Sequence, residues 1–380
     1  MTNKLLASAQ VDAGAVTNRT LFESPFFAAL LTVKEAAVRA CLHLGLADAV
    51  ACEQALAAVQ ILRESGRTLN RCSILLTNRA LNAAVDTAIV SAAGVSDDQG
   101  RRILAVLQTL QSADDVIATA RNLLASQSLQ EVLTAVERIK VSLRAKACQF
   151  AAVPTVARRR LRDDALTTLG AVFESYAVMF VAVQRAVEHA AQTEVLSLMG
   201  TDIGLTVPVG ARQAFAGQVC CELKKLTGVT VRLPSDALAE QGTQSSLIVR
   251  HGAVQSCAAV FWKLARDIRL LCSGPRCGFT QVSLPALAPG SSIMPGKVNP
   301  VILEMAMSSS DQVSANHSGL VMGTLTGWLE FGSESIVPIR AFTISCRVLS
   351  QTMINVVEKC IDGMTADEER CRALAVAAAG

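Results

Sequence analysis

Apolar residues recur at the spacing of an α-helix over long stretches of this chain, and this periodicity constrains the fold more than any other feature. Between Leu169 and Val187 they return every three or four residues, so they share one face of a helix of about five turns. The members of this stripe are Leu169, Val172, Phe173, Tyr176, Phe180, Val183 and Val187. A stripe of this length must be buried against other helices.

Three further stripes have the same period, over Val254–Leu271, over Ile344–Cys360, and from Phe27 to about Ala57. Hydrophobic residues make up 51% of the chain and aromatic residues only 4%. The surplus of Ala, Val and Leu suits close-packed helices better than strands. The best strand candidate, Gly228–Asp236, is short and isolated. We therefore predict an all-α fold, a bundle of long helices.

Prolines mark the predicted breaks between the helices, at Pro154, at Pro208 and within Cys272–Pro300. The last of these segments holds five of the ten prolines in the chain. Proline lacks the backbone donor that a helix interior needs. A loop of this length between two helices is typical of a functional segment.

Charge and composition exclude several classes of function. The net charge is +3, from 35 basic and 32 acidic side chains, which indicates neither a nucleic-acid nor a membrane partner. No run approaches the roughly 20 apolar residues of a membrane span, and the N-terminus lacks the apolar segment of a secretory signal. The 12 cysteines are expected to be reduced, and four scattered histidines indicate no metal site. The prediction is a soluble cytoplasmic protein.

The polar loop Pro289–Glu304 reads PGSSIMPGKVNPVILE and stands out in a chain of apolar helices. Its two glycines allow the backbone to approach a ligand closely. The polar side chains that it offers are Ser291, Ser292, Lys297 and Asn299. Hydroxyls, an amide and a cation can together hold carboxylates. On composition alone, an ordinary polar surface loop explains the segment equally well.

The stretch GSSIMPGKVNP resembles the signature loop of the fumarase/aspartase superfamily, whose members eliminate ammonia, water or another leaving group to give fumarate. Asp267–Phe279, Leu198–Gly204, Glu222–Gly228 and Val249–Val254 also resemble segments of this family. Val357–Cys371 resembles the aspartase branch more than the fumarase branch. The resemblance covers residues 145–371 well, and it implies an all-α homotetramer that acts on a small dicarboxylate.

The resemblance also implies roles for residues of the loop. Removal of a proton beside a carboxylate leaves an enediolate, whose charge the site must stabilise. Ser291 would be the base in its alkoxide form, while Ser292, Lys297 and Asn299 would bind the substrate. Met294 and Glu304 are expected to support the site. No cofactor and no metal are implied.

Two other family segments, supplied by other chains of the tetramer, are expected to converge on each site. The first normally reads Ser-Ser/Thr-Asn-Asp and is here SADD, in which Ser112 and Asp114 are candidate substrate ligands. Thr201, in the glycine-threonine segment, is a further candidate. Asp114 replaces an amide and adds a negative charge where a carboxylate should approach.

The second segment normally reads Gly-Arg-Thr-His/Gln-Leu-Gln-Asp-Ala and is here ARRRLRDD, residues 157–164. Arg160 stands where histidine or glutamine is expected, and it is a candidate substrate ligand. Glu304 matches the family glutamate that contacts this position, so we expect it to pair with Arg160.

The expected domains are an abbreviated N-terminal helical domain (1–114), a central long-helix bundle (115–356) with the signature loop at 272–300, and a remnant of the C-terminal domain (357–380). The leading interpretation is an aspartase-like lyase that eliminates ammonia from an aspartate-type amino dicarboxylate. One alternative is a catalytically silent paralogue that keeps the tetrameric core, as the altered segments would allow. The other is a fumarase or another superfamily lyase with a changed leaving group.

Overall fold

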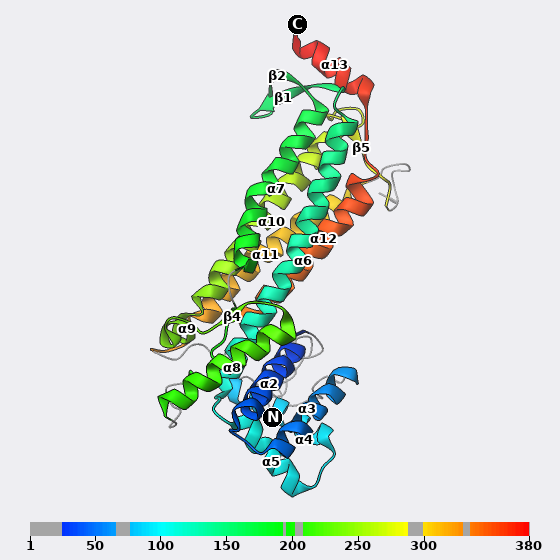
Figure 1. The fold of residues 1–380 in the computed structure, drawn as a ribbon. Coiled ribbons are helices and arrows are strands. Elements are labelled where there is room, and N and C mark those ends of the chain that lie inside the picture. The colour runs from blue at the N-terminus through cyan, green and yellow to red at the C-terminus, as the bar shows by residue number, and fades with distance from the viewer. Residues whose placement is uncertain are drawn as a thin grey trace, which may run out of the picture. The chain divides into compact units, whose positions relative to one another are not determined.

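The structure is a computed structural model that describes residues 25–65, 77–192, 195–201, 208–287, 299–329 and 335–379. These residues form twelve α-helices, one π-helical turn and three two-stranded sheets, so the all-α prediction is confirmed (Figure 1). The chain divides into two compact units, each made of three separate stretches. The domain boundaries expected from the sequence remain a prediction.

Unit 1 comprises Met1–Gln127, Thr193–Ile248 and Gly319–Arg340. In it, α2 packs against α3, α5 and α8, and α3 packs against α4 and α5. Strands β3 and β4 pair in parallel. The elements that lie wholly in unit 1 are α2 (Pro25–Leu44), α3 (Ala49–Glu64), α4 (Asn78–Ala93), α5 (Asp97–Gln108), β3 (Val195–Leu196), α8 (Val209–Thr227), β4 (Val231–Arg232) and α9 (Ala237–Thr243). The start of α6 (Ala113–Gln149) also belongs to it.

Unit 2 comprises Ser128–Gln192, Val249–Ser318 and Ala341–Gly380. Long helices lie side by side in it, with the β1–β2 hairpin and α13 at one end (Figure 1). Four helices belong only partly to this unit. The elements are most of α6, β1 (Pro154–Arg159), β2 (Arg162–Thr168), α7 (Leu169–Gln192), most of α10 (Ser245–Leu271), β5 (Val282–Ser283), most of α11 (Val301–Thr324), most of α12 (Val337–Val356), the π-helical turn η1 (Val357–Ile361), β6 (Thr365–Ala366) and α13 (Glu368–Ala379).

Three of the four predicted stripes, those from Leu169, Val254 and Ile344, lie in the core of unit 2. Phe173, Phe180 and Val187 of α7 are buried, as are Phe261 and Ile268 of α10. By length and composition, α7 alone among the described helices could also cross a membrane. Its buried stripe, which includes Phe173, Phe180 and Val187, is that of a core helix.

Two features of the fold differ from the prediction. The stripe from Phe27 to Ala57 is two helices rather than one, because Gly45 adopts a left-handed φ of 62° that ends α2. The carboxylate of Asp48 then caps α3 by accepting from the Ala51 N–H at 2.8 Å. The segment from Pro154 to Thr168 forms an antiparallel hairpin. We did not predict these strands, because the sequence shows no alternation of apolar and polar residues there.

A buried ion pair joins the helices of unit 1. Lys34 Nζ of α2 lies 2.8 Å from the carboxylate of Asp86 on α4, and the two side chains are 0% and 1% exposed. The ammonium also donates to the Leu107 carbonyl at 2.9 Å and to Gln111 at 3.3 Å. Burial lowers the pKa of Lys34 and raises that of Asp86, in each case against the attraction of the partner.

Two histidines meet inside unit 2. His251 on α10 and His317 on α11 stack with ring centroids 5.1 Å apart, and their Nδ1 atoms are 2.9 Å apart. The edge of Phe342 on α12 lies against His251. Burial, and secondarily the neighbouring His317, lowers the pKa of His251 to about 3. His251 therefore stays neutral in the folded protein at physiological pH.

We expect Lys34→Met to destabilise the protein by about 3–5 kcal/mol, because it leaves the Asp86 carboxylate buried without its cation. The double variant Lys34→Met/Asp86→Leu should recover most of this loss. Urea unfolding measures both. As a control, Arg101→Met breaks the exposed Asp98–Arg101 pair and should cost less than about 1 kcal/mol. A double variant as unstable as the single one would contradict the electrostatic explanation.

We expect acid to destabilise the wild type more than His251→Leu. An unfolded histidine binds a proton below about pH 6.5, whereas folded His251 does so only near pH 3. As the pH is lowered from about 6.5 toward about 3, the free energy of unfolding should therefore fall by up to about 1.4 kcal/mol per pH unit. Above about pH 6.5, His251 should have no effect on it. Urea midpoints at about pH 5 and pH 7.5 test the difference. The exposed His189→Gln variant should behave as wild type, and equal pH dependence in all three proteins would refute the assignment.

Candidate functional site

The SADD segment begins helix α6 and forms a reciprocal cap there. Ser112 Oγ accepts from the Asp115 N–H at 3.1 Å, and the Asp115 carboxylate accepts from the Ser112 N–H at 3.3 Å. Each side chain thus satisfies a backbone donor that a helix start leaves unpaired. The first role of Ser112 in the described structure is therefore to begin α6.

Asp115 also holds the glycine-threonine segment in place. Its buried carboxylate accepts from the Gly200 N–H at 3.2 Å and from Gln241 Nε2 at 3.4 Å. Gly200 has a φ of 73°, and a Cβ there would lie 3.1 Å from the Phe215 ring. Thr201 closes the turn by donating its hydroxyl to the Leu198 carbonyl at 2.6 Å. The structure therefore brings together the segments of Ser112, Asp114 and Thr201 within unit 1.

Asp114 has partners that the sequence did not reveal. Its carboxylate accepts from Asn78 Nδ2 of α4 at 2.6 Å. Arg121 lies two turns further along α6 and is only 6% exposed, and its Nη1 has no hydrogen-bond partner in the described structure. Burial lowers the pKa of Arg121 to about 10, while attraction to Asp114 and then Glu240 opposes the shift. The charge that Asp114 introduces is thus partly balanced within unit 1.

Arg160 lies at the tip of the β1–β2 hairpin. Arg159 and Arg162 are cross-strand partners, so Arg160 and Leu161 make a two-residue turn with φ of 54° and 63°. Such turns normally hold Asn or Gly, since left-handed backbone is costly for larger residues. The hairpin thus holds Arg160 in an uncommon conformation. No described residue forms an ion pair or a hydrogen bond with its guanidinium.

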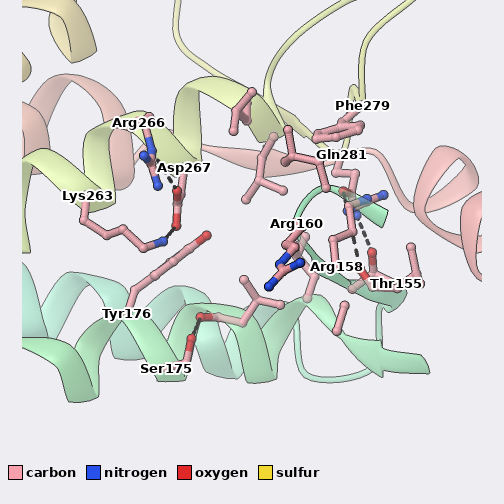
Figure 2. A pocket seen from close by; sticks show the side chains of 17 residues that line it. Thr155, Arg158, Arg160, Ser175, Tyr176, Lys263, Arg266, Asp267, Phe279 and Gln281 are labelled. Carbon is pink, nitrogen blue, oxygen red and sulfur yellow. Dashed lines mark hydrogen bonds and ion pairs between the residues drawn. The ribbon is translucent and has the colours of Figure 1, made fainter. Parts of the chain in front are cut away.

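A cavity of about 720 Å³ opens beneath the hairpin in unit 2 (Figure 2). Arg160 extends into it from the turn, and Lys263, Arg266 and Asp267 face it from α10. The remaining lining residues are Thr155, Val156, Ala157, Arg158, Leu161, Leu169, Val172, Ser175, Tyr176, Leu270, Leu271, Phe279 and Gln281. Among the residues that the structure describes, the lining therefore has four cationic side chains and a single carboxylate.

The carboxylate of the cavity is already paired. Asp267 forms an ion pair with Lys263, and its other oxygen lies 3.6 Å from Arg266 Nε. Burial raises the pKa of the Tyr176 hydroxyl, and the charge of Asp267 raises it further. At neutral pH the cavity is therefore cationic, which suits an anion.

The candidates in and after the signature loop are only partly described. Ser291, Ser292, Met294 and Lys297 lie outside the described residues. The Asn299 carbonyl accepts from the Val301 N–H at 2.8 Å, just before α11. Glu304, in the first turn of α11, pairs with Arg269 at 2.8 Å. Within this chain the expected pairing of Glu304 with Arg160 is therefore not formed.

Sequence reasoning missed most of the cavity. Lys263, Arg266 and Asp267 follow the i, i+3, i+4 spacing of one helix face. This row could have revealed a polar stripe on α10 beside its buried one. Gln281 and Arg121 gave no comparable signal, because nothing in their local sequence marks a buried polar residue.

Comparison with known proteins identifies the family. Residues 9–315 match the family model described as Lyase. The class II fumarate hydratase of Chromobacterium violaceum is 32% identical over 262 residues, 68% of this chain and 56% of that protein. That of Thermosynechococcus vestitus is 33% identical over 267 residues, 69% of this chain and 56% of that protein. The matched region thus spans just over half the length of these relatives.

A solved structure agrees with the sequence relatives. The fumarate lyase:delta crystallin from Brucella melitensis superposes with a TM-score of 0.82 and 29% identity, over 92% of this chain and 81% of that one. This likeness extends over almost the whole described fold.

These comparisons overturn the aspartase interpretation, because the relatives are named fumarate hydratases. That interpretation depended on Val357–Cys371, which forms η1, β6 and the start of α13. Residues there bond to the loop after α10, as when Arg370 donates to the Phe279 carbonyl at 3.2 Å. The residues of this segment thus contribute to packing, and their resemblance to the aspartase branch does not indicate the leaving group. The matched family model and the relatives show that the chain belongs to the lyase family of the fumarase/aspartase superfamily.

Proposed function

We propose that this chain forms a fumarase-like lyase, which adds water to fumarate and eliminates it from malate. The names of the relatives support the substrate, and the cationic cavity around Arg160 is the observation that carries the proposal. The cavity has an excess of positive charge, and the single carboxylate in it is already paired. A dicarboxylate therefore gains attraction there from Arg160.

The same charge balance favours water over ammonia as the leaving group. Aspartate carries an ammonium beside its carboxylates, whereas malate carries a neutral hydroxyl. Two like charges about 4 Å apart near a protein surface repel by about 4 kcal/mol, and by less where water screens them. With Asp267 already paired to Lys263, the described lining of the cavity offers no free carboxylate to hold an ammonium.

The reaction requires a base and a site for the enediolate charge. Ser291 would remove the proton as an alkoxide, supported by the loop backbone and Lys297. Ser292 and Asn299 would hold the carboxylate beside it, with Met294 and Glu304 in support. Arg160 would bind the second carboxylate, since a guanidinium matches a carboxylate with two donors. Ser112, Asp114 and Thr201 complete the set of proposed substrate contacts.

The assembly belongs to the same proposal. The family resemblance implies a homotetramer in which segments of three chains meet at each site. We propose this arrangement here, with a small dicarboxylate as the bound partner.

A catalytically silent chain is the second candidate, and one observation favours it. Asp114 places a carboxylate where the family has an amide, and this carboxylate is held by Asn78 rather than left to a substrate. Only turnover separates a silent chain from a working lyase.

We expect malate to yield fumarate, detected by its ultraviolet absorbance, while aspartate and argininosuccinate yield none. Ser291→Ala should abolish the reaction with the helical circular dichroism unchanged, because the base is lost. A folded wild type that makes no fumarate from any of the three would establish the silent chain. Full activity in Ser291→Ala would remove the base assignment.

We expect Arg160→Met to raise KM for malate by roughly tenfold or more, because one charge-assisted contact is worth about 1.5–3 kcal/mol. Arg162→Met is the matched control, because Arg162 is exposed on the same hairpin and does not line the cavity. Steady-state kinetics give the KM for malate of both variants. Equal KM values in the two variants would exclude Arg160 from substrate binding.

A further inference from the structure

The β1–β2 hairpin must be held in place by its surroundings. A two-stranded hairpin alone is marginally stable in water. Helix α13 packs against both strands, but β2 is mostly exposed. The direction of the turn that carries Arg160 therefore depends on specific contacts of β1 with the rest of unit 2.

Arg158 makes the most specific of these contacts. Its guanidinium lies over the Phe279 ring, 4.3 Å from the centroid, and Nη1 donates to Gln281 Oε1 at 2.9 Å. The side chain is only 12% exposed, and its Nε lies 3.7 Å from Asp163 of β2. Arg158 thus uses the face of its guanidinium on the ring and the edge on the amide, a combination that lysine cannot reproduce.

The two residues that contact Arg158, Phe279 and Gln281, are themselves held by hydrogen bonds. Gln281 is 1% exposed, its N–H donates to the Leu271 carbonyl at 2.8 Å, and its carbonyl accepts from the Asp367 N–H at 3.0 Å. Its side-chain amide also donates to the Thr155 hydroxyl of β1. The Phe279 carbonyl accepts from Arg370 Nε of α13 at 3.2 Å. Figure 2 shows Arg158, Thr155 and Gln281 together at one end of the cavity.

The backbone transmits this anchoring to the turn. Arg158 is two residues before Arg160, and the strand register shifts between Ala157 and Arg158. The extra residue of this bulge is Asp164 of β2, which has no partner in the register, and a bulge increases the local twist of the strand pair. Arg158 is thus the first paired residue of β1 between the bulge and the turn that points Arg160 into the cavity.

We propose that Arg158 is a positioning residue: anchored on Phe279 and Gln281, it fixes the hairpin so that Arg160 meets the substrate carboxylate. The inference rests on the proposed function, because it takes Arg160 as a substrate ligand. Arg158 itself acts through Arg160 and needs no contact with the substrate.

A double-mutant cycle tests the proposal in the full chain. The variants are Arg158→Met, Arg160→Met and the double variant, with Arg162→Met as the control on the same hairpin. The readouts are KM and kcat for malate, and calorimetric binding of succinate, which has no leaving group. Arg158→Met should weaken succinate binding by roughly tenfold, and Arg158→Lys should restore little of it. In the Arg160→Met background, Arg158→Met should have no further effect.

Independent losses of affinity in the cycle would overturn the proposal, because Arg158 would then act separately from Arg160. Hydrogen–deuterium exchange of residues 154–168 provides a readout without ligand. Exchange should rise in Arg158→Met and not in Arg162→Met, and unchanged exchange would also overturn the proposal. If Arg158→Met fails to fold, Phe279→Leu removes the stacking partner and should show the same pattern.

The outcomes separate the two hypotheses. A wild type that binds succinate but makes no fumarate refutes the fumarase-like function, and the cycle in succinate affinity still decides the role of Arg158. A wild type that turns over malate while Arg158→Met binds succinate normally refutes the positioning role alone. A wild type that neither binds succinate nor turns over malate refutes both.

Discussion

A long α-helix satisfies its own backbone, so the backbone donors and acceptors that remain for other contacts are at its ends. This constraint organises the polar chemistry of the chain. Ser112 and Asp115 pair with backbone donors where α6 begins, Arg160 lies in the hairpin that follows α6, and Asn299 lies just before Pro300 and α11. The bundle interior supplies rigidity, while Ser112, Arg160 and Asn299 lie outside the helices.

Buried polar residues connect segments that are distant in the sequence. Each such residue must make hydrogen bonds within the protein in place of those to water that it lost on folding. The carboxylate of Asp115 accepts from three donors, the Ser112 N–H, the Gly200 N–H and Gln241 Nε2. The ammonium of Lys34 pairs with Asp86 and donates to two further oxygens, one of Leu107 and one of Gln111. Gln281 uses both ends of its amide to join β1 to the loop after α10. Such contacts specify one arrangement of segments that apolar packing alone leaves open.

The sequence predicted what local periodicity encodes. The stripe from Leu169 lies on α7 and the stripe from Val254 lies on α10. Both were predictable because the apolar residues of a buried helix face recur in each successive turn. The break at Gly45 was missed because the apolar spacing continues across it, and the hairpin was missed because its stability comes from α13, Phe279 and Gln281. For the site, the resemblance proposed the segments, and their roles stay predictions. The cavity could not be predicted, because it requires residues of α7, α10 and the hairpin to meet in space.

The replacement at Arg160 also limits the mechanism. A histidine at this position could exchange a proton with the substrate, but a guanidinium stays charged and cannot accept one. The described lining of the cavity contains no histidine, and His251 is buried in unit 2, where it stacks against His317. In the proposed reaction the hairpin therefore contributes charge and orientation only. Proton removal then depends on the signature loop, where Ser291 must be activated by its own backbone and by Lys297.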